Sequence, residues 1–471
     1  MKLRRVVALV LFFGAFSATA GTKTWSGTVS SSWNVAGNWQ ELAIPLSGDA
    51  LVFPIGALTP TTSNNLAAGN VYVSITFQGS GFVVSGNALQ LSGGVTTTNT
   101  TGTNAIQQGV TFTSAGPNIK VASGGALTFA SSVTLGAGSS LDFQVDGDAT
   151  MGGPISGSAA IVKDGPGALT LSGNNTYTGT TTVNAGTLVA TIGTALGSPA
   201  TGTQVASGAT LQLQGGITST EPLSIAGFGV GNAGALLSAS GTNTYSGPIT
   251  LTGTGSNYVG VSAGTLTIDG VISSPPATTT PITKVGAGTL ALSGANTYSG
   301  NTTVLVGDVS VQNPSALGDL AFPTVVAFGA ALDIQGGIDV AEPLSINGLG
   351  IGASPQGALR SVSGGNAVTG SVTLQSDAAI GVDSGSVFII QGNVDGSGFL
   401  RKVGLGQLIL SGTNSYTGQT RVNVGVLRAQ SGAALGDPTT GTIVSGGAAL
   451  ELQGNINIGN ESLDLAGTGV A

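Results

Sequence analysis

The sequence predicts an all-β protein whose chain coils into a parallel β-helix, with a cap at its N-terminal end. Three observations support this fold class. The composition is rich in glycine and poor in charge, short segments alternate between apolar and polar residues, and one long motif occurs three times.

The composition excludes the common alternatives to a packed β fold. Only 7% of the 471 residues are charged and 41% are hydrophobic, whereas intrinsically disordered chains combine low hydrophobicity with high charge. Glycine occurs 80 times but without a three-residue register, which excludes collagen. The remaining interpretation is a chain of short strands joined by many tight turns.

The alternation has a period of two, as in strands that bury one face. Pairs such as Leu169 and Leu171, or Leu211 and Leu213, are bracketed by Gly, Asn or Ser, and no window has a helical spacing. Strands this short suit a coil in which each strand pairs with its equivalent in the coil before. We expect a narrow core of small side chains with little room for aromatic ones.

The repeated motif divides most of the chain into units. "GALTLSGNNTYTGTTTVNAGTLV" begins at Gly167, and related segments begin at Gly288 and Gly406, with the motif's tyrosine at Tyr177, Tyr298 and Tyr416. At roughly 20 residues per coil, a unit of about 120 residues holds about six coils, and residues 70–471 form a rod on the order of 95 Å long. The expected segments are first coils at 70–162, unit 1 at 163–283, unit 2 at 284–401 and a truncated unit 3 at 402–471.

The N-terminus has the features of a secretory signal peptide over residues 1–20. A basic head of Lys2, Arg4 and Arg5 precedes an apolar run and a small-residue cleavage site. The run is too short to span a bilayer comfortably. The alternative interpretation is a buried N-terminal helix.

The net charge narrows the possible partners, and the cysteine count narrows the possible sources of stability. Without its first 20 residues the chain has nine bases and twenty acids, a net charge of −11, so nucleic acid is not an expected partner. There is no cysteine, so stability has to come from backbone hydrogen bonds and packing.

The region 21–69 contains all three tryptophans, Trp25, Trp33 and Trp39. We expect a cap over the first coil, because the open end of a solenoid is an exposed sheet edge. The alternative is a platform on which sugar rings stack.

The three segments that begin at Lys163, Lys284 and Lys402, with the core pattern "LSGxNxY", resemble the autotransporter-associated β-strand repeat, also called the passenger-associated transport repeat. The opening "TWSGTVSSSWNVAGNWQELAIPLSGDALVF" is similar to the region that often precedes such repeats. The resemblance implies a right-handed β-helical passenger that is exported and then displayed on, or released from, the cell surface. It also implies that the repeat supports secretion and carries no catalytic residues.

Full-length members of this family usually end in an outer-membrane β-barrel, which reads as alternating segments of about ten residues. This sequence has none and stops within a repeat at Ala471. We therefore expect that any membrane attachment is made by a barrel beyond this chain, although a secreted protein without a barrel is the alternative.

Few residues could carry chemistry. Without His or Cys, the usual nucleophile–base pairs and zinc sites lack their side chains. The closest acidic group is Asp142, Asp146 and Asp148, which alternation places on one strand face; such acids could serve glycoside hydrolysis or lyase chemistry, or bind Ca²⁺. We favour a solvated outer face, because no Arg or Lys lies within fourteen residues in the sequence. The Ca²⁺-binding nonapeptide of other solenoids does not occur.

Lys163, Lys284 and Lys402 recur at one place in the unit. Because they are about six coils apart they cannot form a cluster, and we interpret them as solvated turn residues rather than a row of ligand-binding groups.

Together these features predict a non-enzymatic, cell-surface or secreted passenger that acts as a stalk, adhesin or display scaffold. We expect no catalytic, cofactor-binding or metal-binding residues and no cofactor. Glycans or proteins of a host or cell surface are possible partners. The alternative function is a polysaccharide-degrading β-helix enzyme, either a lyase or a glycoside hydrolase.

Overall fold

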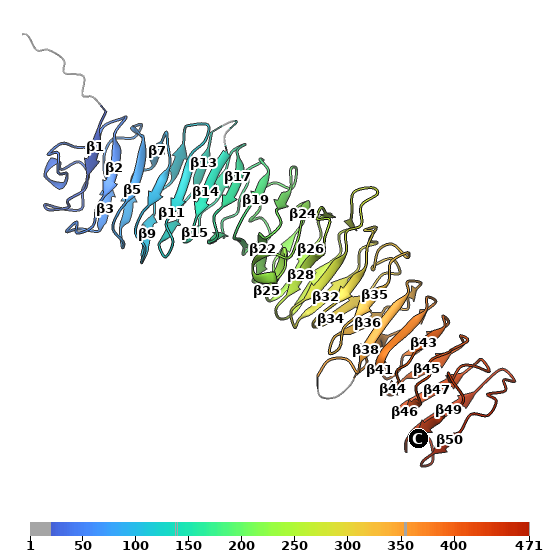
Figure 1. The fold of residues 1–471 in the computed structure, drawn as a ribbon. Coiled ribbons are helices and arrows are strands. Elements are labelled where there is room, and N and C mark those ends of the chain that lie inside the picture. Colours follow the sequence, from blue (N-terminus) through green and yellow to red (C-terminus); the bar gives the residue numbers. More distant parts are fainter. Residues whose placement is uncertain (1–19, 137, 139, 353–355, 471) are drawn as a thin grey trace, which may run out of the picture.

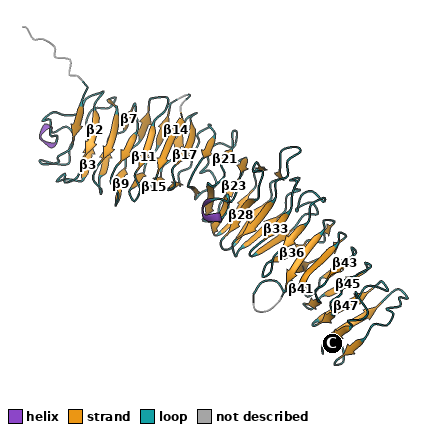
Figure 2. Ribbon diagram, viewed as in Figure 1, coloured by secondary structure: helices purple, strands orange, loops and turns teal. Residues whose placement is uncertain are grey.

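The chain forms a long, slightly bent rod of short strands that run across the rod axis, with the N- and C-terminal regions at opposite ends (Figure 1). The structure is a computed structural model that describes residues 20–136, 138, 140–352 and 356–470. The expected signal peptide at 1–20 lies almost entirely outside the described residues. Among them, helix is limited to two single turns of 3₁₀ helix, η1 (Ala36–Asn38) and η2 (Val230–Asn232), as Figure 2 shows. The all-β prediction is confirmed.

The strands form a parallel β-solenoid of about 19 turns, as the alternation predicts. Every pairing between named strands is parallel and joins one coil to the next, as in β17 (Ala160–Asp164) with β19 (Thr181–Val183). At about 4.8 Å per coil this stacking gives a rod about 90 Å long. Coil lengths vary: Ile161 pairs with Thr181, 20 residues later, whereas Leu223 pairs with Ile249, 26 residues later.

Each coil has three faces, and strands stack along each face. The first face is a sheet of twelve strands: β1 (Thr22–Thr24), β2 (Ala50–Phe53), β5 (Ser74–Phe77), β8 (Val95–Thr97), β11 (Asn118–Val121), β14 (Ser140–Val145), β17, β19, β21 (Thr203–Val205), β24 (Leu223–Ile225), β27 (Ile249–Leu251) and β30 (Ile272–Ser273). This sheet begins at residue 22, so the first rungs of the solenoid already lie inside the expected cap region.

The second face is the longest stack. Its central strands are β15 (Asp148–Met151), β18 (Ala168–Leu171), β20 (Thr187–Ala190), β22 (Thr210–Gln214), β25 (Leu236–Ser240), β28 (Asn257–Val261), β31 (Ile282–Val285), β33 (Thr302–Val304), β35 (Thr324–Val326), β38 (Leu344–Gly348) and the first part of β41 (Val372–Val382).

The third face begins with a sheet of five strands: β4 (Val71–Tyr72), β7 (Leu89–Leu91), β10 (Val110–Phe112), β13 (Val133–Leu135) and β16 (Ile155–Ser156). It resumes further along the rod with β26 (Thr242–Tyr245), β29 (Thr265–Ile268), β32 (Thr289–Leu292), β34 (Asp308–Val311), β36 (Ala331–Gln335), β39 (Leu359–Ser363), the last part of β41, β44 (Leu400–Val403) and β46 (Thr420–Val422).

The first face resumes toward the C-terminal end as a sheet of six strands, because each of them follows a strand of the third face in the chain. Its strands are β37 (Asp339–Val340), β40 (Gly365–Val368), β42 (Val387–Ile390), β45 (Gln407–Leu410), β47 (Gly425–Ala429) and β49 (Ala448–Leu452).

The repeat unit does not contain a whole number of coils. The strand with Lys163 lies on the first face, but Lys284 pairs with Val259 on the second face and Lys402 pairs with Ile380 on the third. Along the second face, five steps lead from β18 to β31, so unit 1 spans five coils plus one face. The expected six coils per unit is therefore wrong, and each unit starts about a third of a turn around the axis from the one before.

The alternating residues fill the interior as predicted. Leu171, Leu292 and Leu410 are equivalent and fully buried. The expectation that aromatic side chains have little room is wrong, because Tyr177, Tyr298 and Tyr416 are also fully buried.

Candidate functional site

The recurring lysine of each unit lies inside the solenoid. Lys163, Lys284 and Lys402 are each 0% exposed, so their interpretation as solvated turn residues is wrong. The reason is the period of two: an apolar residue two positions earlier (Ile161, Ile282 or Leu400) points inward, and the lysine follows it on the same side of the strand.

Backbone carbonyl groups surround each ammonium group. Lys163 Nζ donates hydrogen bonds to Gly165 O at 2.7 Å and to Asp164 O and Ala185 O at 3.1 Å. Lys402 Nζ donates to the equivalent carbonyls of Val403, Gly404 and Val424 at 2.6–3.0 Å. The acceptors come from the turn after the strand and from the next coil, so each lysine ties two coils together.

Burial lowers the pKa of each of these lysines to about 8 from the usual 10.5. At pH 7 the charged form therefore predominates, held by carbonyl dipoles instead of water. No surface opening reaches these three side chains, so they cannot act as nucleophiles or bases on an external substrate.

In each motif, an asparagine side chain makes the hydrogen bonds between coils that a strand backbone makes elsewhere. Asn175 Oδ1 accepts a hydrogen bond from Ile155 N–H at 2.8 Å, and its Nδ2 donates to Ala195 O at 2.5 Å. Asn296 and Asn414 make the same two contacts in their units. Each side chain thus links the coil before to the coil after, where the motif loop has no strand to do so.

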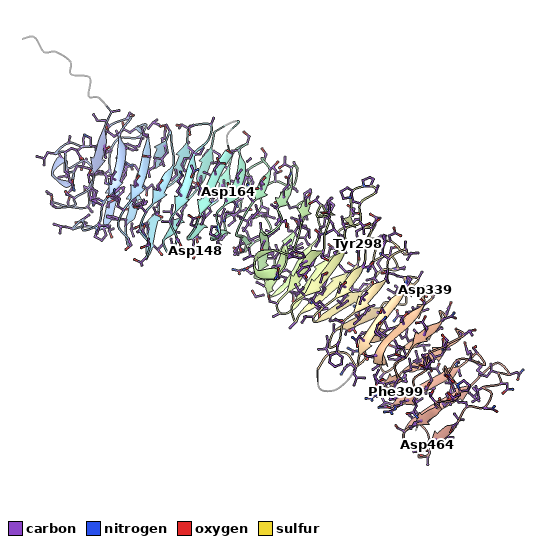
Figure 3. The ribbon with its side chains drawn as sticks, viewed as in Figure 1. Asp148, Asp164, Tyr298, Asp339, Phe399 and Asp464 are labelled. Atoms are coloured by element: carbon purple, nitrogen blue, oxygen red, sulfur yellow. The ribbon has the colours of Figure 1, made fainter. Side chains whose placement is uncertain are left out.

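The motif tyrosine lies in the interior beside a threonine. The hydroxyl groups of Tyr177 and Thr181 are 2.6 Å apart, as are those of Tyr416 and Thr420. A Cβ atom at Gly197 would lie 2.9 Å from the Tyr177 ring, which explains why the "ALG" block of each unit ends in glycine. The tyrosine fills the volume that this glycine leaves free. Figure 3 labels the second member of the series, Tyr298.

A glutamate recurs in each unit; Glu221 and Glu342 are buried, and Glu461 is half-buried. Glu342 Oε1 accepts a hydrogen bond from Thr324 Oγ1 at 2.7 Å, while its Oε2 has no partner among the described residues. Burial raises the pKa of Glu342 to about 8 and that of the equivalent Glu221 to about 7. These carboxyl groups are closed to solvent, which argues for a structural role.

The predicted acidic group does not share one strand face. Asp142 lies on the outward side of β14, Asp146 lies in the turn that follows, and Asp148 begins β15 on the next face. Asp146 and Asp148 are exposed, as expected for a solvated outer surface. Asp148 is labelled in Figure 3, and its Oδ1 accepts a long hydrogen bond of 3.3 Å from Ala168 N–H.

The three tryptophans form a closed cluster at the N-terminal end of the solenoid. All are 0% exposed, and Trp39 makes edge-to-face contacts with Trp25 and Trp33 at ring-centroid distances of 5.1 and 5.7 Å. No ring face is open to a sugar, so the stacking-platform alternative is wrong. The cluster packs on Phe53 of β2, as a cap does.

A charged cluster that the sequence reasoning missed lies on the outer side of unit 2. Arg360 of β39 donates to both carboxylate oxygens of Asp383 at 2.9 and 2.6 Å, and its Nη1 lies 3.5 Å from Asp333 Oδ2. Burial raises the pKa values of Asp333 and of nearby Asp308. The pairing of Ser310 with Asp333 and of Asp333 with Arg360 on successive coils is the signal that could have found the cluster, but it requires the coil register.

The described residues contain no group of three or more His, Cys, Asp or Glu side chains placed to hold a metal ion. Nor is any helix in the described part of the chain long and apolar enough to cross a membrane.

Comparisons with known proteins agree with the repeated geometry. Residues 161–190, 282–311 and 400–429 match the sequence model of the passenger-associated transport repeat. Each match spans the lysine, asparagine and tyrosine described above.

A second comparison finds a curated relative. Over 274 residues, 57% of this chain, the sequence is 33% identical to the adhesin BmaC autotransporter of Brucella suis biovar 1 (strain 1330). The matched region is 7% of the length of that protein. No solved structure matches. The sequence, the interior contacts and the family match together show that this chain carries three copies of the passenger-associated transport repeat of autotransporters.

Proposed function

We propose that this chain is the rod-like part of an autotransporter passenger, which is exported to the cell surface and acts there as a non-enzymatic adhesin. The observation that carries the proposal is the inward orientation of the side chains that recur in the motif. Lysine, asparagine, tyrosine and glutamate all point inward and bond to the backbone or to threonine, so the motif builds the rod and leaves its outer faces for contact.

The relative supports the choice of adhesin over a bare stalk or display scaffold, because it is named as an autotransporter adhesin. The acidic charge of the chain supports a protein or glycan partner over nucleic acid. The rod shape supports a role in which binding surfaces are held away from the membrane (Figure 1).

Attachment of cells tests this proposal. The chain is fused to a heterologous outer-membrane anchor and displayed on a non-adherent bacterium, with the anchor alone as control. We expect displayed chain to raise the number of bacteria bound to host cells or to host matrix. Equal attachment by the anchor alone, with surface exposure verified by antibody, contradicts an adhesin role.

The enzymatic alternative has its own test. Purified residues 21–471 are incubated with acidic and neutral polysaccharides, and release of reducing or unsaturated ends is measured. We expect no turnover. Turnover that disappears when Asp142, Asp146 and Asp148 are all changed to Asn would instead identify an enzyme, because general acid–base catalysis contributes at least about 10²-fold.

A further inference from the structure

A cleft lies in the C-terminal half of unit 2. It has a volume of about 630 Å³, which falls within the usual range for small-ligand sites. Four successive coils contribute its walls, and four of its ten lining residues are glycines, so backbone forms much of its surface. The side chains that matter for the argument are Phe328, Ser376, Asp377, Ser397 and Arg401.

Phe328 supplies an aromatic surface that the solenoid core does not need. Its side chain is 76% exposed, whereas units 1 and 3 have Ser207 and Gly446 at the equivalent position. A Cβ atom at Gly348 would lie 2.8 Å from the Phe328 ring, so the ring rests on the backbone of the next coil. An aromatic ring fixed in this way at the edge of a cleft offers a flat apolar surface to a ligand.

Arg401 supplies a positive charge without a counter-charge. It makes no hydrogen bond or ion pair with the other described residues. Arg401 directly precedes Lys402, and the residues that directly precede the other two motif lysines, Val162 and Thr283, are uncharged. In the coil register, Arg401 pairs with Arg421 of the next coil, so two guanidinium groups are neighbours on the same face. Arg421 is engaged elsewhere, with its guanidinium 4.5 Å from the Phe399 ring centroid and its Nε donating to Gln419 Oε1 at 2.8 Å. Figure 3 labels Phe399 beside this region.

Hydroxyl and carboxylate groups complete the cleft. Ser397 and Asp377 are exposed, and Asp377 Oδ1 accepts a hydrogen bond from Phe399 N–H at 3.0 Å, which fixes the carboxylate and leaves Oδ2 as an acceptor. A carboxylate in the same cleft as the arginine disfavours a phosphate dianion, because Asp377 repels it. The same pair suits a ligand that carries both a single negative charge and several hydroxyl groups.

We propose that this cleft binds a sugar residue that carries a carboxylate, as sialylated and uronic-acid-containing glycans do. In this arrangement the carboxylate of the acidic sugar pairs with Arg401, and its hydroxyl groups donate to Asp377 and exchange hydrogen bonds with Ser397. A neighbouring ring of the same glycan packs on Phe328, because three coil steps of about 4.8 Å separate Phe328 from Arg401. The proposal rests on the adhesin function above and names the class of ligand. It places the specificity in unit 2, and not in the motif that all three units share.

Equilibrium binding of defined oligosaccharides to residues 21–471 tests the proposal. The probes are 3′-sialyllactose and tetragalacturonate, with lactose and the methyl ester of 3′-sialyllactose as uncharged counterparts. We expect at least one acidic probe to bind about 10- to 100-fold more tightly than lactose, since hydrogen bonds to charged groups have that effect. We also expect the methyl ester to bind as weakly as lactose, and added salt to weaken the acidic probe.

Four variants locate the binding. Arg401→Gln should reduce binding of the acidic probe at least about 10-fold, and Phe328→Ser, which introduces the residue of unit 1, should weaken it as well. The matched controls are Lys120→Gln, which removes an exposed charge elsewhere, and Phe228→Ser, which removes a 45% exposed ring in unit 1. Both controls should bind as the parent does. Circular dichroism verifies the fold of every variant.

Three results would each overturn the proposal: no binding of either acidic probe at 10 mM, unchanged binding by Arg401→Gln, or equal binding of the acid and its methyl ester. The display assay separates this failure from failure of the adhesin function. If the displayed chain still mediates attachment while neither acidic sugar binds, only the ligand class is wrong.

Discussion

Lys163, Lys284 and Lys402 show how a charged side chain becomes part of a narrow apolar interior. Each ammonium group replaces lost hydration with carbonyl oxygens from its own turn and from the next coil. The buried glutamates are the opposite case, since burial favours their neutral form. Two kinds of buried titratable group with opposite shifts give the rod an unusual response to pH.

We expect the stability of the folded chain to pass through a minimum near pH 8. The pKa of Glu221 and of Glu342 is raised above 4.5 to about 7 and about 8, so their contribution is full below pH 4.5 and is lost as pH rises through these values. The pKa of the three lysines is lowered from 10.5 to about 8, so stability increases again between pH 8 and 10.5. Urea midpoints between pH 5 and 10 measure this profile. Glu342→Gln should reduce the loss of stability as pH rises toward 8. A maximum of stability near pH 8 would contradict the pKa shifts given above.

The adjacent residues Asn174 and Asn175 offer a matched pair. Asn175→Ala should destabilise the chain by about 1–3 kcal/mol, because Ile155 N–H and Ala195 O lose their buried partner. Asn174→Ala should have little effect, because Asn174 is exposed and contacts only Thr194 Oγ1. Hydrogen exchange of the Ile155 amide reports the change directly. Equal protection of that amide in both variants would show that the side-chain contact does not matter.

At the scale of the strand and its turn, a second matched pair separates backbone strain from side-chain clash. Gly197 and Gly208 have similar positive φ values of 86° and 88°, but only at Gly197 does a Cβ atom meet Tyr177, with its backbone oxygen at 2.7 Å and its ring at 2.9 Å. Gly197→Ala should therefore cost about 1–3 kcal/mol more than Gly208→Ala, which meets nothing within 4 Å. Urea unfolding of the two variants measures the difference, and equal costs would mean that the backbone and ring of Tyr177 both move aside.

The inward face of a strand should tolerate no lone carboxylate. Leu171→Asp places an unpaired charge where the side chain is 0% exposed, which costs several kcal/mol, whereas Thr170→Asp on the outward face of β18 should be mild. Limited proteolysis should cut the Leu171 variant faster than the parent near that coil. The coils on each side contact only their neighbours, so we expect local opening instead of loss of the whole rod. Cleavage at parental rates would contradict the burial.

The sequence predicts these elements to different degrees. The period of two identifies Leu171, Leu292 and Leu410 as interior residues, and the spacing of Tyr177, Tyr298 and Tyr416 identifies the units. Charge alone places the lysines at the surface, whereas alternation places them inside, because Ile161 and Lys163 have the same parity. Arg401 and Phe328 differ from their equivalents in the other units, so a comparison of the units with one another could have singled them out. The cluster around Arg360 depends on which coils are neighbours, and unequal coil lengths hide that register.

At the scale of the whole molecule, the rod should be measurable in solution. A mature chain of about 19 coils should have a maximum dimension of about 90 Å or more by small-angle X-ray scattering, since coils stack at about 4.8 Å. Far-UV circular dichroism should show less than about a tenth helix, against roughly a third in ordinary globular domains. A compact scattering profile, or substantial helix, would contradict the solenoid.

Because each unit spans five coils plus one face, each unit is rotated about the rod axis by about a third of a turn relative to the unit before. Equivalent loops of units 1, 2 and 3 point to three different sides, so neighbouring copies of a binding loop cannot engage one flat surface together. Inserting or deleting a single unit by recombination would keep the interior intact while turning every distal loop about a third of the way round. Only a change of three units would restore the original orientation. Repeat number in such a chain therefore sets the direction in which its tip faces, as well as its reach.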